Sequence, residues 1–262
     1  MTKKLFLFTK KFLFPGLDIG ARSRMKFAKN FKPGDILTLD IGCGNGAFSF
    51  VATKLGNRVI GIDFDEEKLK RCLEFRDYLK IKPDQCDFMV LNAYNLLSIQ
   101  KQFDQIICFE TLEHIKDDKK IIELTTKVLK PGGVLHLCVP SANRKPYYGE
   151  IISEIEDGNH VRLGYTFETM EKMLEKVGLV VVGRDTAVGI VSQKLLSSIN
   201  WIDINLFKNL PKRGNDVVHL IIFILLYPLS FIIKFLDRLL PSKPLNIYIA
   251  AKKVDAHLIT TP

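Results

Sequence analysis

The chain has 262 residues, of which 47% are hydrophobic and 10% aromatic, and its formal net charge is +9. This composition excludes a disordered chain, and the length suits one large domain or one domain with an insertion. The charge is uneven, because residues 1–32 carry nine basic residues and a single acid, Asp18, whereas residues 33–189 carry more acids than bases. A basic segment that alternates with phenylalanines suits a membrane surface, an anionic small molecule or nucleic acid, although most charge runs are simply solvated.

The N-terminal residues 1–34 are predicted to form a basic arm or lid. Their apolar pieces, LFLF and FLF, are interrupted by Lys10 and Lys11 and are too short for a secretory signal. The run LDIG at 17–20 precedes a basic helical pattern, so Asp18 is expected to cap a helix. The chain's five cysteines are odd in number and form no CxxC pair, which indicates reduced thiols and a cytoplasmic location.

From residue 35 to 189, strand and helix patterns alternate. Apolar runs predict strands at 36–41, 58–63, 87–92, 103–110, 133–140 and 179–185, and amphipathic segments predict helices at 46–55, 65–80, 119–129 and 166–177. Most of these strands are continuously apolar, as expected for strands covered on both faces. The alternation predicts an α/β fold with a Rossmann-like, doubly wound and mostly parallel sheet.

A second LDIG run, at 39–42, continues into a D-x-G-x-G-x-G turn between the first strand and the first helix of this region. Glycines permit a tight turn and let a ligand approach the backbone, and the following helix N-terminus favours an anionic group. Asp63 ends the second strand, where a nucleoside ribose would present its hydroxyls. Because Gly42, Gly44 and Ala47 also fit the dinucleotide fingerprint, the turn alone leaves a methyl donor and a hydride carrier open.

The wider pattern separates these readings. LDIGCGNG, VIGIDFDEEKL, the stretch from FDQIICFETLEH to LKPGGVLHLCVP, and GNHVRLGYTFETMEKMLEKVGL together resemble the class I S-adenosylmethionine-dependent methyltransferases, in the small-molecule group that includes the ubiquinone-biosynthesis type. The resemblance covers about residues 35–185. It implies a seven-stranded sheet with an antiparallel last strand, which we assign to residues 244–253, and a tail at 254–262.

The resemblance also implies a set of cofactor-binding residues. Asp63 would bond the ribose hydroxyls and Phe64 would lie along the adenine, with core packing as the alternative for Phe64. An Asp is frequent in the family at the position of Asn92, whose carbonyl oxygen can still meet the adenine amine. The residues expected around the methionine half and the adenine edge are Asp40, Gly42, Cys43, Gly44, Phe109, Asn92 and Ala93. The arm preceding the first strand would cover the cofactor, so that Arg22 or Arg24 would reach its carboxylate.

The residues expected to bind the acceptor are indicated less specifically than those expected to bind the cofactor. His160 is the best candidate for a general base, with lid packing as its alternative, and Glu110 is a weaker catalytic candidate, as is His114. Tyr147 and Tyr148 are candidates for lining the acceptor pocket. The sequence shows no metal-ligand spacing, so no metal is predicted. A Pro-Cys nucleophile and the D/N-P-P-Y/F motif are both missing, which makes nucleic acid an improbable substrate.

Residues 190–243 interrupt the alternation and are predicted to be an apolar helical insertion. The run 217–233 holds 17 residues without Asp, Glu, Lys or Arg, at the lower edge of what a spanning helix needs. If both flanking strands join one sheet, the insertion is a lid, a dimer contact or a peripheral membrane contact, the last together with residues 1–32 at the inner face of a membrane. The predicted function is methyl transfer to a small, lipid-like acceptor. The alternatives are a soluble metabolite or sugar acceptor, an NAD-dependent oxidoreductase, or a non-catalytic cofactor-binding module.

Overall fold

The structure is a computed structural model that describes residues 19–187, 189–202 and 243–254, together with single positions at 7, 8, 10, 11, 14, 205, 232, 235–237 and 239. The expected cap at Asp18 lies outside the described residues, as does the apolar run 217–233 apart from Ile232. Within the described part of the chain, no helix is long and apolar enough to cross a membrane.

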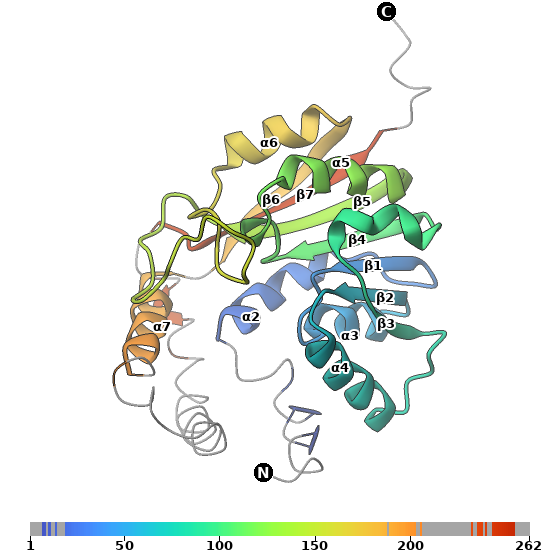
Figure 1. Ribbon diagram of the computed structural model, residues 1–262, viewed down its shortest axis with the longest axis horizontal. Coiled ribbons are helices and arrows are strands. Elements are labelled where there is room, and N and C mark those ends of the chain that lie inside the picture. Colours follow the sequence, from blue (N-terminus) through green and yellow to red (C-terminus); the bar gives the residue numbers. More distant parts are fainter. Residues whose placement is uncertain are drawn as a thin grey trace, which may run out of the picture.

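Seven strands form one sheet in the order β3-β2-β1-β4-β5-β7-β6 (Figure 1). The strands pair in parallel except β7, which is antiparallel to both β5 and β6. This confirms the predicted doubly wound sheet with an antiparallel last strand. The strand bounds are β1 Leu37–Ile41, β2 Arg58–Asp63, β3 Cys86–Val90, β4 Phe103–Phe109, β5 Leu129–Pro140, β6 Leu179–Ala187 and β7 Asn246–Lys253.

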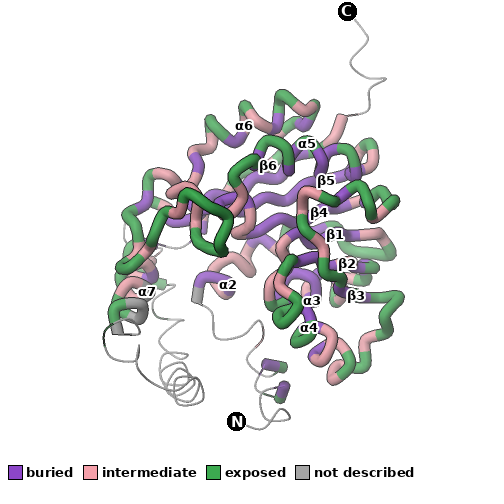
Figure 2. Tube along the Cα trace, viewed as in Figure 1, coloured by how far each residue is buried: buried purple, intermediate pink, exposed green. Residues whose placement is uncertain are grey.

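Helices cover both faces of the sheet. One face carries α2 (Ile19–Arg24), the 3-10 helix η1 (Met25–Asn30), α3 (Ala47–Lys54) and α4 (Glu66–Tyr78), and the other carries α5 (Asp118–Val128) and α6 (Phe167–Glu175). Two further 3-10 helices, η2 (Ala93–Ile99) and η3 (Leu112–His114), follow β3 and β4, and α7 (Ile190–Ile202) follows β6. Figure 2 shows that the central strands are mostly buried, whereas α6 alternates between buried, intermediate and exposed residues.

The strand bounds differ from the predicted ones mainly in β5. The run LKPGG was expected to end a helix, but β5 begins at Leu129, four residues before the predicted start. Leu129 pairs with Phe103, and the register shifts before the next pair, Gln105 with Val134. The extended stretch is therefore a bulged continuation of the strand, a local irregularity that periodicity does not reveal.

The segment before β1 is held against the sheet by aromatic packing. Phe27 is fully buried and stacks on Tyr248 of β7, with ring centroids 4.4 Å apart and planes 11° apart. Phe31 packs on His136 of β5 at 5.1 Å, and Lys26 forms an ion pair of 2.9 Å with Asp185 of β6. These contacts fix the helical pair α2–η1 across β5, β7 and β6, so the basic segment lies on the sheet.

Asp40 joins β1 to the first turn of α3. Its side chain is buried and accepts a hydrogen bond of 2.5 Å from Ser49 Oγ. Burial raises the pKa of Asp40 to about 7, and the Ser49 hydrogen bonds only partly oppose this shift. The carboxyl group therefore keeps its proton in the folded protein over a pH range in which the unfolded chain has lost it.

This raised pKa predicts a pH-dependent stability. A raised folded-state pKa contributes stability that is fully present below the unfolded pKa of about 4 and is lost as pH rises through about 7. Asp40→Asn keeps an oxygen that can accept from Ser49 but removes the titration. The free energy of unfolding of the wild type, minus that of the variant, should fall by about 3–4 kcal/mol between these pH values. Chemical denaturation over a pH series measures this difference, and a flat difference would contradict the assignment.

Candidate functional site

The glycine-rich turn after β1 has one glycine that faces open space. All three glycines have positive φ, at +66° for Gly42, +53° for Gly44 and +74° for Gly46. A Cβ at Gly42 would overlap the Thr111 side chain, and one at Gly46 would lie 2.9 Å from Phe50, so packing requires both glycines. A Cβ at Gly44 would meet only a backbone oxygen 4.0 Å away. The turn is therefore shaped to leave room for a ligand at Gly44.

The side chains expected to bind a nucleoside lie beside this turn. Asp63 is 7% exposed, and its two oxygens accept hydrogen bonds from the backbone N–H groups of Gly44 (2.9 Å) and Asp65 (3.0 Å). Each carboxylate oxygen keeps further acceptor capacity. Phe64 follows it and is 67% exposed, which is unusual for a phenylalanine that only packs the core. This pair fits a ribose and an adenine, as the resemblance implies.

Asn92 and Ala93 lie at the next strand end, where η2 begins. Asn92 is exposed, and its Oδ1 accepts from Tyr94 N at 2.9 Å, capping the 3-10 helix. This hydrogen bond orients the Asn92 amide. Oδ1 is also the atom expected to accept from the adenine amine, so it would have to accept two hydrogen bonds. The two residues stay candidates for the adenine edge.

Three other expected cofactor residues lie mainly beneath the turn. Asp40 is directed to Ser49, and burial raises the pKa of the Cys43 thiol, so this thiol is inert. Phe109 is 6% exposed and packs in the aromatic cluster of α2–η1, with its ring 4.5 Å from Phe48. These residues shape the floor of the turn, and a direct contact with a cofactor stays a prediction for each.

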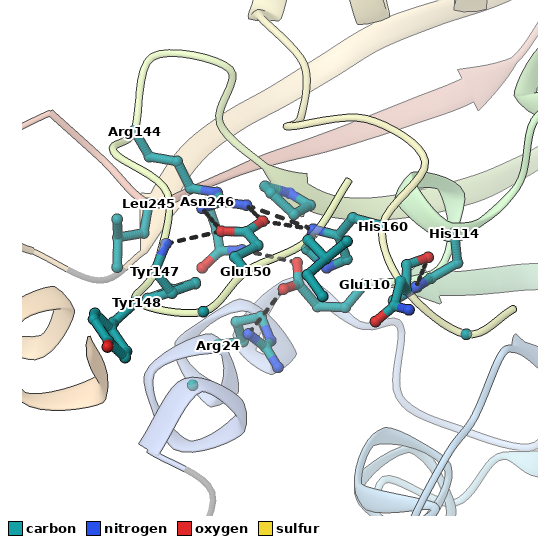
Figure 3. A pocket seen from close by; sticks show the side chains of 16 residues that line it. Arg24, Glu110, His114, Arg144, Tyr147, Tyr148, Glu150, His160, Leu245 and Asn246 are labelled. Atoms are coloured by element: carbon teal, nitrogen blue, oxygen red, sulfur yellow. Dashed lines mark hydrogen bonds and ion pairs between the residues drawn. The ribbon is translucent and has the colours of Figure 1, made fainter. Parts of the chain in front are cut away.

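A pocket of about 420 Å³ lies at the C-terminal end of β4 (Figure 3). Its wall includes Glu110, and the next residue, Thr111, donates to Ile41 O directly before the turn. The ends of β4, β5 and β7, the helix α2 and the loop 141–165 surround it. Five acceptor-side residues chosen from the sequence lie together in its wall, namely Glu110, His114, Tyr147, Tyr148 and His160. Arg24 also lines the pocket. The resemblance implied that Arg22 or Arg24 would reach the cofactor carboxylate.

Glu110 is held in a strained backbone conformation at the end of β4. Its φ is +52°, a region that non-glycine residues rarely adopt, and its N–H donates to Cys138 O at 2.8 Å. Its side chain accepts from Arg24 Nη1 at 3.2 Å and from Asn246 Nδ2 at 2.8 Å. The carboxylate therefore ties the N-terminal segment to the start of β7 across the pocket wall. Strain of this kind is common at functional sites.

A second ionic group lies in the loop 141–165. Arg144 binds both oxygens of Glu150, with Nη1 2.7 Å from Oε2 and Nη2 close to Oε1. His160 Nδ1 lies 3.0 Å from Glu150 Oε1, and the Tyr147 N–H donates to Oε2 at 2.8 Å. Burial raises the pKa of Tyr147 to about 12, so its hydroxyl is suited to donate a hydrogen bond and not to act as a base.

Although the sequence predicted no metal, the structure gathers three possible ligands. Glu113, His114 and His160 each offer one atom, and these atoms all lie within 4.8 Å of one another. Glu113 is fully buried and neither of its oxygens has a hydrogen-bond partner. Burial and the nearby Glu110 raise its pKa well above the ordinary value. The group could hold a metal ion, because the donors are two imidazoles and one carboxylate.

Sequence reasoning missed Arg144, Glu150 and Asn246 as pocket residues. Arg144 and Glu150 flank the two predicted tyrosines in NRKPYYGE, directly after the C-terminal end of β5, where ligands of open α/β sheets bind. Charged residues around paired tyrosines at that position were an available signal. No sequence signal marks Asn246 as a pocket residue, because its role depends on β7 lying next to β5.

Comparison with known proteins agrees with this geometry. Residues 34–183 match the family model described as "Methyltransferase domain". The human mitochondrial ubiquinone biosynthesis O-methyltransferase is 28% identical over 189 residues, which cover 68% of this chain and 50% of that protein. The match thus spans about half of the relative's length.

Solved structures show the same fold at low sequence identity. The [4+2]-cyclase SpnF has a TM-score of 0.61 at 16% identity and covers 89% of this chain and 81% of its own. Phosphoethanolamine N-methyltransferase 2 of Haemonchus contortus, solved with S-adenosyl-L-methionine, has a TM-score of 0.57 at 19% identity and covers 95% of this chain and 57% of its own. The fold alone thus does not fix the reaction, whereas the family model covers more than half of the chain. The chain belongs to the class I S-adenosylmethionine-dependent methyltransferase family.

Proposed function

We propose that the chain transfers a methyl group from S-adenosylmethionine to a small-molecule acceptor. The observation that carries this proposal is the glycine turn, which is open at Gly44 and is linked to the polar pocket through Thr111, the residue that follows Glu110 and packs on Gly42. Gly44 would leave room for the methionine half, Asp63 would accept from the ribose hydroxyls, and Phe64 would offer an aromatic surface to the adenine. The bound cofactor supplies an activated methyl group, and the protein mainly aligns acceptor and donor.

The acceptor atom is proposed to be a hydroxyl oxygen. The relative named above is an O-methyltransferase, and a hydroxyl must lose a proton as its oxygen is methylated. His160 lines the pocket and is the residue suited to take that proton. Tyr147 and Tyr148 line the same pocket on the acceptor side, while Glu110, fixed by Arg24 and Asn246, organises the polar wall.

The core division is part of this proposal. Residues 35–189 and 244–253 form the cofactor-binding core, residues 1–34 form the arm that covers it, and residues 190–243 form the insertion, followed by the tail 254–262. The arm reaches the turn, because Lys10 Nζ donates to Asn45 O at 2.9 Å. A cytoplasmic location and a homodimer stay predictions from the sequence.

The cofactor assignment predicts a selective loss of binding. Asp63→Asn should weaken S-adenosylmethionine binding about 10–100-fold, because a carboxylate that accepts from hydroxyls becomes an amide. Asp65→Asn is the matched control, because Asp65 caps α4 by accepting from Lys68 N and Asn also caps helices. Calorimetry measures both variants, and NAD is titrated in parallel. Binding of NAD without binding of S-adenosylmethionine would refute the proposal in favour of an oxidoreductase.

The role of His160 predicts a loss of turnover without loss of cofactor binding. His160→Ala should lower kcat about 10²–10⁴-fold towards a panel of phenols, alcohols and amines, with S-adenosylhomocysteine formation as the assay. A base needs no metal, so wild-type turnover should survive a chelator. If turnover disappears with the chelator and returns with a divalent ion, the reaction needs a metal, and the group of Glu113, His114 and His160 becomes the candidate site. Unchanged turnover in the variant would remove both roles.

We further propose that residues 1–32 and 190–243 contact a membrane surface that delivers a lipid-like acceptor. Large apolar side chains are exposed on the insertion, with Trp201 at 46%, Phe235 at 60% and Leu239 at 62%. The helix α7 also touches the pocket loop, because Gln193 Nε2 donates to Lys145 O at 2.6 Å. An apolar, basic segment beside the acceptor pocket suits contact with anionic headgroups. The alternative is that the insertion is a lid for a soluble metabolite or sugar.

Vesicle flotation distinguishes these alternatives. The protein should float with phosphatidylcholine vesicles that contain phosphatidylglycerol, and high salt should release it because the basic charges are then screened. The double variant Trp201→Ala, Phe235→Ala should reduce the bound fraction severalfold. Val180→Ala, Val182→Ala is the matched control, since these valines are equally exposed but lie on the edge strand β6. Recovery of the wild type entirely in the unbound fraction would exclude membrane contact.

A further inference from the structure

The loop 141–165 contains a buried ionic group whose geometry bears on the chemistry of His160. The Arg144 side chain is 1% exposed and that of Glu150 is 9% exposed, although both carry charge. Buried ion pairs are costly to desolvate and are a weak source of stability. Stability alone therefore does not account for the pair. One of its neighbours is His160, whose Nδ1 lies 3.0 Å from Glu150 Oε1.

Glu150 can only accept hydrogen bonds in this setting. Both of its oxygens are bound by the Arg144 guanidinium, and Oε2 also accepts from the Tyr147 N–H. A permanently charged guanidinium on both oxygens and a backbone N–H on one of them favour the charged form of this carboxyl group, independently of His160. The carboxylate is thus ionised, and an ionised carboxylate has no proton to donate.

This constraint decides which nitrogen of His160 carries its proton. His160 Nδ1 lies 3.0 Å from Glu150 Oε1 and 3.5 Å from Arg144 Nη2. The contact with the carboxylate requires an N–H at Nδ1, whereas the contact with the guanidinium would require a lone pair there. A lone pair at Nδ1 would face the Glu150 oxygen at 3.0 Å, and two acceptors at that distance repel each other. Arg144 Nη2, by contrast, already has Glu150 as its acceptor. In the neutral ring the lone pair is therefore on Nε2.

We propose that Glu150, locked by Arg144, is the positioning residue that fixes His160 as the Nδ1–H tautomer and so keeps the Nε2 lone pair available in the acceptor pocket. The catalytic meaning of this arrangement rests on the proposed function, since Nε2 is then the atom that takes the acceptor proton. Arg144 sets the orientation of the carboxylate, because its planar guanidinium engages both oxygens at once. The tautomer itself does not depend on any acceptor.

Long-range proton–nitrogen NMR spectra of the neutral protein test the tautomer directly. With ¹⁵N-labelled histidine, a chelator and a pH of about 8.5, above the ordinary titration range of histidine, the two ring nitrogens give distinct signals. His160→Gln identifies the His160 resonances by their loss. His160 should be almost entirely Nδ1–H. A wild-type ring that is mainly Nε2–H would overturn the proposal without recourse to any variant.

The chain supplies an internal reference for the opposite tautomer. His136 is buried, with Nε2 3.0 Å from Gln105 Oε1 and Nδ1 2.7 Å from the Tyr248 hydroxyl. Gln105 Oε1 also accepts from Lys32 N, so it is an acceptor and His136 carries its proton on Nε2. His136 should therefore give the Nε2–H pattern in every variant.

Glu150→Gln should invert the tautomer of His160. Arg144 Nη1 and the Tyr147 N–H both donate to the Oε2 position, so the amide oxygen of Gln belongs there. The amide NH₂ then occupies the Oε1 position, and Arg144 Nη2 loses its acceptor there. Both groups are donors that lie beside His160 Nδ1, so the ring proton moves to Nε2 and Nδ1 accepts. Glu154→Gln is the matched control, because Glu154 is an exposed acid in the same loop. His160 should stay Nδ1–H in that control.

Turnover and binding complete the test. With the acceptor panel, Glu150→Gln should lower kcat about 10–100-fold and change the acceptor KM less than about threefold, with cofactor affinity unchanged. A folded variant with an inverted tautomer and wild-type kcat would refute the positioning role. If the variant does not fold, the wild-type tautomer still decides the assignment. Failure of the wild type to methylate any acceptor would count against the proposed function and leave the tautomer result standing.

Discussion

The pairing of β7 between β5 and β6 is the constraint on which the acceptor side depends. Asn246 at the start of β7 is in register with both Pro140 at the end of β5 and Ala187 at the end of β6. The insertion therefore leaves the sheet and returns to it at neighbouring positions, beside the pocket that Leu245 and Asn246 line. A single membrane crossing would separate its two ends by about 30 Å, which this register does not allow. Asp237 adds a second tie, because its carboxylate accepts from Val191 N at 2.8 Å at the start of α7.

The N-terminal segment reaches the same pocket from the face of the sheet that also carries α3 and α4. Phe27 stacked on Tyr248 fixes η1 on β7, and the helix α2 that precedes it carries Gly20 and Arg24 into the pocket wall. Arg24 then meets Glu110, whose other oxygen binds Asn246. Two segments far apart in the sequence thus converge on one carboxylate at the end of β4. This convergence explains why Glu110 is kept in an unfavourable backbone conformation.

The sequence was sufficient for the sheet and for the cofactor turn, because both depend on local patterns. Apolar runs predicted the strands to within a few residues, and spaced glycines predicted the turn. The two LDIG runs have the different surroundings that the sequence indicated, since the run at 39–42 leads into the glycine turn and the run at 17–20 precedes Arg24. That the earlier run begins a segment closing the cofactor site stays a prediction. The described part of the earlier run, Ile19 and Gly20, is helical.

The pocket was only partly predictable, because its members meet through tertiary contacts. His160 and the tyrosines were found by their place after β5, but Glu150 matters only because Arg144 folds back onto it across six residues. The group of Glu113, His114 and His160 was missed for a similar reason. Its ligands are separated by 46 positions between His114 and His160, which no metal-binding spacing would connect.

The charge balance of the pocket bears on the choice between the two acceptor classes. It contains two guanidinium groups, and each is paired with a carboxylate, Arg24 with Glu110 and Arg144 with Glu150. Recognition of a sugar nucleotide requires cationic side chains or helix N-termini that are available to bind its phosphates. To release Arg144 for that purpose would leave Glu150 as a buried, unpaired charge, which is strongly unfavourable. Next to this balanced group, Ile151 lines the pocket and is 65% exposed. Among the described lining residues, this balance of charge and the apolar margin therefore support the proposed lipid-like acceptor over a sugar nucleotide.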